Sequence, residues 1–142
     1  MPLDFQMSKL RQQLAEFEIE PPARFAKLLP HRDGRPGKCF EAAEHVILNA
    51  DVGAGLVLVH GTCRAPSGGE TAHAWIEVPG SLVYDAVLGR IYGWDVYQEK
   101  LQAIPFKRYS VAEVVALVKT TDTHGPWTEE EERQARNSDA SA

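Results

Sequence analysis

The sequence predicts an α+β domain in which N-terminal helices pack on an antiparallel β-sheet. Apolar residues recur at helical spacing through the first 50 residues, and short runs rich in branched residues follow up to about residue 90. Helices segregated from an antiparallel sheet define the α+β class. A chain of 142 residues, 44% of them hydrophobic, can bury the core of one domain. We expect this domain to cover residues 1–127 and a disordered polar tail to cover residues 128–142.

The N-terminal third predicts two helices and a loop. The first helix follows Ser8, a residue type that caps helix N-termini, and its apolar positions have helical spacing: Leu10, Leu14 and Phe17. Two prolines end it, and residues 23–29 form a second helical run. The segment "PHRDGRPGK" is rich in proline and glycine, which predicts a loop up to residue 38.

The remaining elements alternate between helix and strand patterns. "CFEAAEHVILN" predicts a helix with Cys39 in its first turn. Ser110 and Glu113 have capping-box spacing ahead of an apolar helix. Between these two helices the sequence predicts strands at "GLVLVHGTC", "AHAWIEV" and "SLVYDAVL", a short helix at "WDVYQEKLQ" and a further strand at "IPFKRY".

Cys39 stands where a nucleophilic thiol is favoured. Such a nucleophile needs a thiolate, a base within hydrogen-bonding reach and a group that orients the base. The unpaired N–H groups and the dipole at a helix N-terminus favour thiolate, and the same N–H groups can hold a developing oxyanion. Gly37, two residues earlier, would let the loop approach a substrate backbone closely. A small core cysteine without chemistry is the alternative interpretation.

His73 and Asp85 are the candidates for the base and its orienting group. In a strand, His73, Trp75 and Glu77 share one face. Because tryptophan is unusual on a solvated face, this face is expected to line a cleft, with Trp75 as a substrate contact. Asp85 would hold the imidazole tautomer and stabilise the imidazolium. A histidine satisfied locally inside a strand is the alternative.

Hairpin geometry decides whether His73 and Asp85 share a face. A two-residue loop at Pro79-Gly80 would separate them, but proline cannot adopt the positive φ that such a turn needs. We therefore expect a three-residue loop. Residues 78–80 as the loop would place the two side chains directly opposite, and residues 79–81 would make them diagonal neighbours on one face.

The same stretches resemble the transglutaminase-like, papain-related cysteine enzymes. "GKCFEAA" resembles their G-x-C-x-x-x-A motif, "LVLVHGT" the strand that follows it, "HAWIEV" their H-A-W-x-E-V motif, and "VYDAV" the strand with the third catalytic residue. The resemblance covers about residues 37–88. It implies a papain-like or transglutaminase-like core in which Cys39 is the nucleophile, His73 the general acid and base, and Asp85 the orienting residue.

This resemblance also implies a function. Family members hydrolyse or transfer amide bonds as peptidases, amidases, deamidases or transglutaminases, through a thioester and without a metal. We therefore expect a thiol hydrolase or acyltransferase that uses no cofactor and acts on a protein or peptide. A non-catalytic interaction module that keeps the fold is the alternative. Two features depart from the family: Ala86 follows Asp85 where many relatives have proline, and no tryptophan precedes Trp75. The upstream polar candidates for an oxyanion partner are Gln12, Gln13 and His31.

Composition and the remaining motifs narrow the other possibilities. The formal net charge of −5 and the lack of a basic stripe argue against a nucleic-acid partner. No apolar run approaches the roughly 20 residues that span a bilayer, and no secretory signal is recognisable, so we expect a cytoplasmic protein without a structural disulfide. Zinc is disfavoured because His60 and Cys63 would point to opposite faces of a strand. The aromatic group at residues 92–97 is expected to pack in the core, with Trp94 as part of a substrate wall in the alternative.

Overall fold

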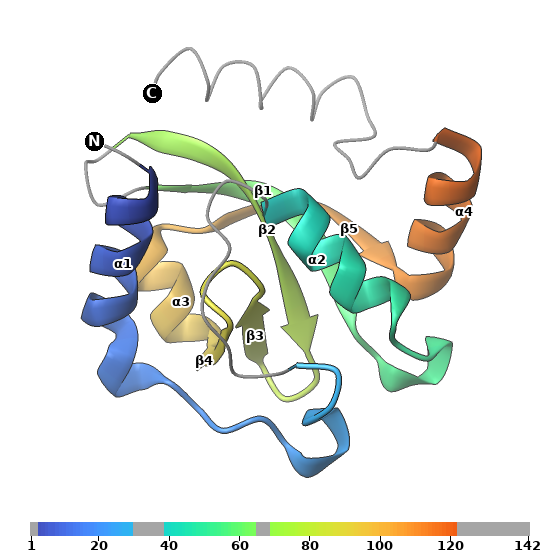
Figure 1. Ribbon diagram of the computed structural model, residues 1–142, viewed down its shortest axis with the longest axis horizontal. Coiled ribbons are helices and arrows are strands. Elements are labelled where there is room, and N and C mark those ends of the chain that lie inside the picture. The colour runs from blue at the N-terminus through green and yellow to red at the C-terminus, as the bar shows by residue number, and fades with distance from the viewer. Residues whose placement is uncertain (1–2, 30–38, 65–68, 122–142) are drawn as a thin grey trace.

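The computed structural model describes residues 3–29, 39–64 and 69–121, which form helices on both sides of an antiparallel sheet (Figure 1). Its helices are α1 (Leu3–Leu14), α2 (Cys39–Leu48), α3 (Trp94–Leu101) and α4 (Val111–Thr121). Its strands are β1 (Val57–Arg64), β2 (Glu70–Val78), β3 (Leu82–Asp85), β4 (Arg90–Gly93) and β5 (Ile104–Ser110). Short 3₁₀ turns cover Ala15–Phe17, Ala23–Phe25 and Val52–Ala54. This content agrees with the expected α+β class.

The five strands form one sheet in the order β4-β3-β2-β1-β5, and every neighbouring pair is antiparallel. The register between β1 and β5 shifts between His60 and Gly61. Gly61 has no room for a side chain, because an added Cβ would overlap the carbonyl oxygen of Ile104 and approach the Trp75 ring within 2.8 Å. The close approach of these two groups therefore requires glycine at this position.

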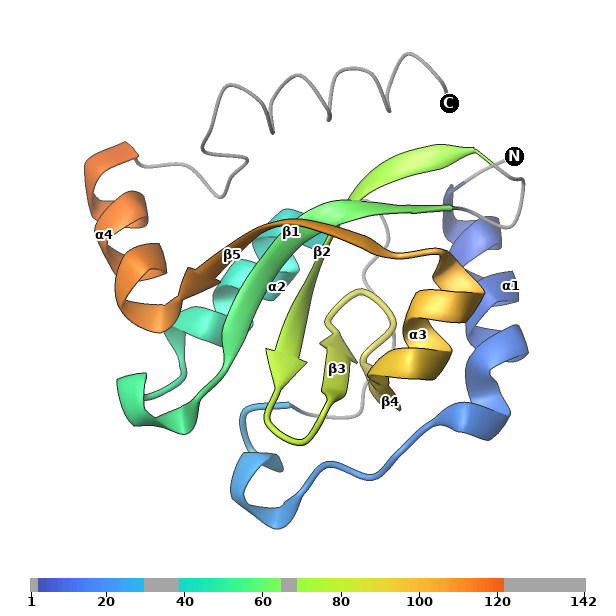
Figure 2. The same ribbon diagram turned by 180° about the vertical axis from the view of Figure 1, so that it is seen from behind.

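Each face of the sheet is covered by its own pair of helices. Helix α2 lies over β1 and β2 on the face seen in Figure 1, and α4 packs beside it. Helix α3 covers the other face together with α1 (Figure 2). The alternation along β2 matches this arrangement, because Ala74 and Ile76 join the first core and Trp75 joins the second. Both faces of β2 are thus buried.

The structure confirms several predicted elements. Helix α2 begins at Cys39, α3 covers the predicted short helix, and α4 follows a capping box. In that box the Glu113 N–H donates to Ser110 Oγ at 3.2 Å, and the Ser110 N–H donates to Glu113 Oε1 at 3.1 Å.

Other predicted elements need correction. Helix α1 begins at Leu3, so Ser8 lies inside it and is not its N-cap. The second helical run is only the 3₁₀ turn Ala23–Phe25. Strand β4 was not predicted, because four residues that follow a tight turn carry too short a pattern. The predicted loop at residues 30–38 and the tail at residues 128–142 lie outside the described residues.

No helix in the described part of the chain combines the length and the apolar character that crossing a membrane would require.

Candidate active site

Cys39 is the first residue of α2 and is partly buried. The N–H groups of the first helical turn have no partners within the helix. The thiol therefore lies beside backbone dipoles that favour negative charge. Of the residues expected around it, Gly37 lies outside the described part of the chain.

The β2–β3 hairpin brings His73 and Asp85 to the same face of the sheet. Its last pair joins Val78 to Leu82, so the loop consists of the three residues 79–81. Gly80 and Ser81 in this loop adopt positive φ angles of 96° and 61°. This is the second of the two three-residue loops considered above, the one that makes His73 and Asp85 diagonal neighbours.

His73 lies between the other two candidate residues. Its Nε2 lies 2.8 Å from Asp85 Oδ2, and the side chains of His73 and Asp85 are 7% and 0% exposed. Cys39 lies near enough to the His73 ring to contribute to its raised pKa. Because Asp85 occupies Nε2, Nδ1 is the ring nitrogen that remains open. A thiol, a base and an orienting carboxylate need this order of neighbours.

Asp85 is held by four donors. Its Oδ1 accepts hydrogen bonds from the backbone N–H groups of Val87 and Leu88, both at 2.9 Å. Its Oδ2 accepts one from the Tyr97 hydroxyl at 2.6 Å, in addition to the contact with His73. Both carboxylate oxygens are therefore satisfied, as a buried charge requires.

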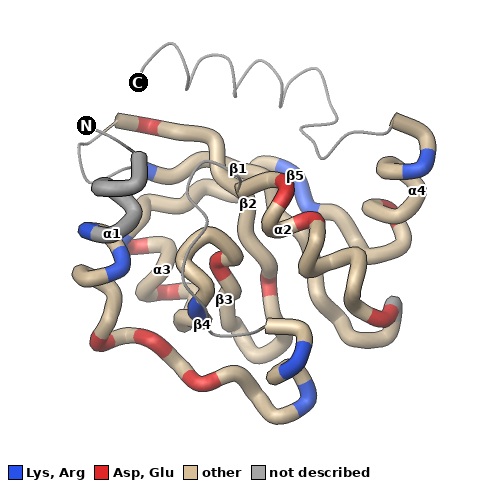
Figure 3. Tube along the Cα trace, viewed as in Figure 1, with Lys and Arg blue, Asp and Glu red and all other residues tan. Residues whose placement is uncertain are grey.

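The charges on His73 and Asp85 stabilise each other. Burial alone lowers the pKa of His73, but the Asp85 carboxylate, together with smaller contributions from Cys63 and Cys39, raises this pKa well above the ordinary 6.5. Burial alone raises the pKa of Asp85, but the imidazolium and the hydrogen bonds from Tyr97 and Leu88 bring this pKa below its ordinary 3.8. An imidazolium–carboxylate pair is therefore the favoured state near neutral pH. Charged residues elsewhere are spread over the helices, the segment that follows α1 and several strands, β5 among them (Figure 3).

Cys63 lies on the same face as His73. The register pairs Gly61 with His73 and Cys63 with Thr71, so Cys63 and His73 are diagonal neighbours. Burial raises the pKa of Cys63 to about 11, although the nearby imidazolium opposes this. Cys63 therefore remains a thiol at neutral pH.

Trp75 does not form the substrate wall expected of it. Its side chain is 0% exposed and packs in the core against α3, with ring centroids 5.9 Å from Tyr97 and 6.3 Å from Trp94. The strand alternation identified its face correctly, but α1 and α3 cover that face. Trp75 thus supports the sheet beside His73 and presents no surface to a substrate.

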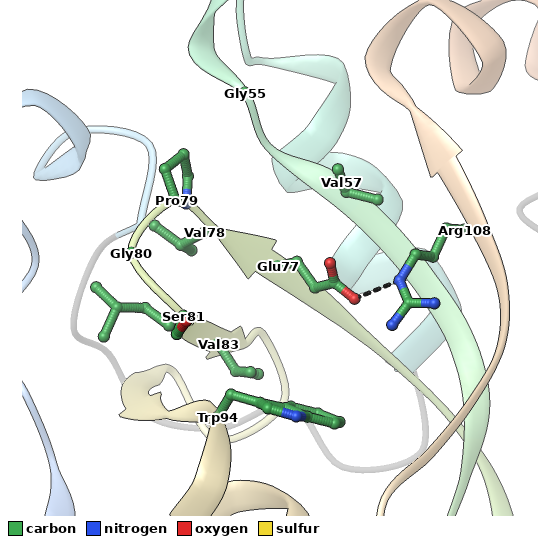
Figure 4. A pocket seen from close by; sticks show the side chains of 11 residues that line it. Gly55, Val57, Glu77, Val78, Pro79, Gly80, Ser81, Val83, Trp94 and Arg108 are labelled. Atoms are coloured by element: carbon green, nitrogen blue, oxygen red, sulfur yellow. Dashed lines mark hydrogen bonds and ion pairs between the residues drawn. The ribbon is translucent and has the colours of Figure 1, made fainter.

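Trp94 is partly buried and lines a pocket away from the three residues. This pocket, about 330 Å³ in volume, lies between the β2–β3 hairpin and the start of α3 (Figure 4). Apolar side chains form most of its wall, and the Arg108 Nε donates to Glu77 Oε1 at 2.6 Å along one side. None of Cys39, His73 and Asp85 lines it.

The sequence analysis missed the part that Tyr97 plays. Tyr97 was expected only among the core aromatics, and nothing in the sequence relates it to Asp85, twelve residues earlier. Cys63 was expected to be structural and to lie near the cleft, and the register of β1 and β2 places it on the His73 face. Of the candidate oxyanion partners, Gln12 and Gln13 are exposed on α1.

The residues considered for zinc lie apart. His60 contacts the Phe40 and Tyr109 rings edge-on, at centroid distances of 4.7 and 5.2 Å, whereas Cys63 belongs to the core on the other face. Among the described residues no three histidine, cysteine or acidic side chains are grouped closely enough to hold a metal ion.

Comparisons of the chain with protein-family models, with curated proteins and with solved structures find no match. The functional argument therefore depends on the geometry of the site itself.

Proposed function

We propose that the chain is a cysteine-dependent enzyme with a papain-like or transglutaminase-like core, which attacks amide bonds in a protein or peptide. The observation that supports it is the hydrogen bond between His73 and the buried Asp85, together with the placement of Cys39 at the first position of α2, where it lies near enough to His73 to contribute to its raised pKa. A lone cysteine or a lone histidine would carry little weight. The three together supply a nucleophile, its proton carrier and the group that orients the carrier.

In the first half of the reaction, the Cys39 thiolate attacks the carbonyl carbon of the amide. The carbonyl oxygen becomes an oxyanion, and N–H groups at the start of α2 are placed to donate to it. The carbon–nitrogen bond then breaks, and the His73 imidazolium gives its proton to the leaving nitrogen. The products of this half are a free amine and a thioester on Cys39.

In the second half, neutral His73 takes a proton from the acceptor as the acceptor attacks the thioester. Water as acceptor gives a carboxylic acid, and a primary amine gives a new amide. The carbon–sulfur bond breaks, and Cys39 leaves as a thiolate beside the restored imidazolium. Asp85 stays ionised throughout, which its depressed pKa favours.

A non-catalytic binding module is the second candidate. The observation that favours it is the pocket at Trp94, which holds apolar surface and an ion pair but is separate from Cys39. Its volume of about 330 Å³ is at the small end of the range for ligand sites. A binding module would use this pocket and leave the thiol unreacted.

Trapping the thioester tests the proposal. The chain would be incubated with a mixture of peptides and a labelled primary amine, quenched in acid and weighed intact. We expect an acyl adduct on the wild type that hydroxylamine removes. The adduct should be absent from Cys39→Ala and present on Cys63→Ala, the control that removes the other thiol. A wild type that carries no adduct and releases no product would contradict the proposal.

A further inference from the structure

We propose that Tyr97 is a positioning residue, which sets through Asp85 how firmly His73 holds its proton. The inference depends on the proposed function. Its basis is a shared atom: the Tyr97 hydroxyl donates to Asp85 Oδ2 at 2.6 Å, and His73 Nε2 lies 2.8 Å from the same oxygen. The other oxygen, Oδ1, is occupied by two backbone N–H groups. Tyr97 is thus the side chain that competes with His73 for the charge on Oδ2.

The Tyr97 ring is fixed by its neighbours. It is fully buried, and its centroid lies 5.9 Å from Trp75, 6.1 Å from Tyr92 and 6.4 Å from Trp94. Packing on three sides leaves the ring little freedom to turn away from Asp85. The hydroxyl is therefore held at the carboxylate without the entropy cost that a mobile donor would incur.

Tyr97 also stays a donor at every pH at which the protein would work. Burial and the negative charge of Asp85 hold the pKa of Tyr97 well above its ordinary 10. A neutral phenol beside a carboxylate can only donate to it. The hydrogen bond from Tyr97 withdraws part of the negative charge on Oδ2. It therefore weakens the electrostatic attraction by which the carboxylate stabilises the imidazolium.

Several other described groups surround the pair. Element by element, they are Cys39 from α2, Cys63 from β1, Tyr92 and Arg90 from β4, and Tyr97 from α3. Arg90 is the register partner of Asp85, and its guanidinium lies 3.4 Å from the Glu18 carboxylate. Cys63 and Tyr92 are held neutral, because burial raises the pKa of each. Asp85 therefore dominates the field at His73, and Tyr97 moderates it.

Tyr97→Phe and Tyr92→Phe form a matched pair for the test. Tyr92 lies in the same stack and is equally buried, but among the described residues its hydroxyl has no hydrogen-bond partner. Both variants lose one buried hydroxyl from one aromatic cluster. Only Tyr97→Phe loses a bond to Asp85, so a merely structural effect should appear in both.

The readout is the protonation state of the His73 ring, which nitrogen NMR monitors as a function of pH. The His73 signal is assigned by its absence from the spectrum of His73→Gln. At the pH where half of the wild-type His73 is protonated, Tyr97→Phe should raise the ratio of imidazolium to imidazole at least about threefold. This change corresponds to a fraction of the free energy of a hydrogen bond to a charged group. Tyr92→Phe should leave the ratio unchanged. Equal titration curves for the two variants, or a lower ratio in Tyr97→Phe, would overturn the inference.

A second substitution keeps the test decisive if Tyr97→Phe fails to fold. 3-Fluorotyrosine at position 97 keeps the ring and the hydroxyl but makes the hydroxyl a stronger donor, so the ratio should fall instead of rise. An unchanged ratio would overturn the inference. The proposed function fails separately: it is contradicted if wild-type His73 titrates like a free imidazole and does not respond to Cys39→Ala.

Discussion

Replacing Asp85 by asparagine should disable the site while leaving the fold intact. The amide oxygen of asparagine can still accept the backbone N–H groups of Val87 and Leu88, as Asp85 Oδ1 does. The NH₂ group takes the place of Oδ2 and becomes a donor. The Tyr97 hydroxyl can turn so that its oxygen accepts a hydrogen bond from this NH₂ group. His73 can accept a hydrogen bond from the same group only if its Nε2 carries no proton. The ring proton then lies on Nδ1, facing the thiol, and His73 can no longer take the proton of Cys39.

The size of both effects follows from the contacts. The two hydrogen bonds at Oδ2, of about 1.5–3 kcal/mol each while the carboxylate is charged, become neutral ones of about 0.5–1.5 kcal/mol each. The two at Oδ1 also lose the charge, so the free energy of unfolding should fall by at least about 2–3 kcal/mol. Without the imidazolium the Cys39 thiol loses the positive charge that favours its thiolate form. We therefore expect alkylation at pH 6.5 to slow by about 10- to 100-fold.

The assay is alkylation of Cys39 by iodoacetamide at pH 6.5, with urea unfolding measured alongside. Asp51→Asn is the matched control, because Asp51 is exposed and its side chain makes no capping hydrogen bond. It should change the unfolding free energy by less than about 0.5 kcal/mol and leave the alkylation rate unchanged. If Asp85→Asn alkylates at the wild-type rate across the pH range, the reasoning about the tautomer is wrong.

Three further predictions concern the surroundings of the site. Gly61→Ala should lower the free energy of unfolding by about 1–3 kcal/mol in urea titration, since its Cβ overlaps the Ile104 carbonyl; an unchanged midpoint would show that β5 shifts freely. In folded protein at pH 7, Cys63 should resist iodoacetamide, so that one label per chain is found by intact mass; rapid double labelling would contradict its burial. The His73–Asp85 pair should stabilise the fold fully only between about pH 3.8 and 6.5. Stability falls as pH rises through the raised pKa of His73 or drops through the lowered pKa of Asp85, and a flat profile of unfolding free energy against pH would refute this.

Local rules accounted for much of the site. A glycine-rich segment followed by an apolar helical pattern placed Cys39 at the start of α2. The exclusion of proline from a two-residue turn predicted the odd loop that puts His73 and Asp85 on one face. Both arguments depend on neighbours in sequence, which is why they succeed without knowledge of the packing.

Features that depend on tertiary packing were not predictable in the same way. The alternation of β2 separated Trp75 from Ala74, but it could not show that α1 and α3 cover the Trp75 face. Tyr97 reaches Asp85 because α3 folds back across β3 after the short strand β4. No periodicity in the sequence encodes that crossing, so the hydrogen bond between Tyr97 and Asp85 emerges only from the structure.

The most direct test of the central claim is the alkylation rate of Cys39 as a function of pH, measured on the wild type, Cys39→Ala and His73→Ala. The proposed function predicts that Cys39 is alkylated at pH 6.5 much faster than a free thiol. That fast alkylation should be absent from Cys39→Ala and slower in His73→Ala. Alkylation at the rate of a free thiol, unaffected by His73→Ala, would contradict the claim and favour the binding module.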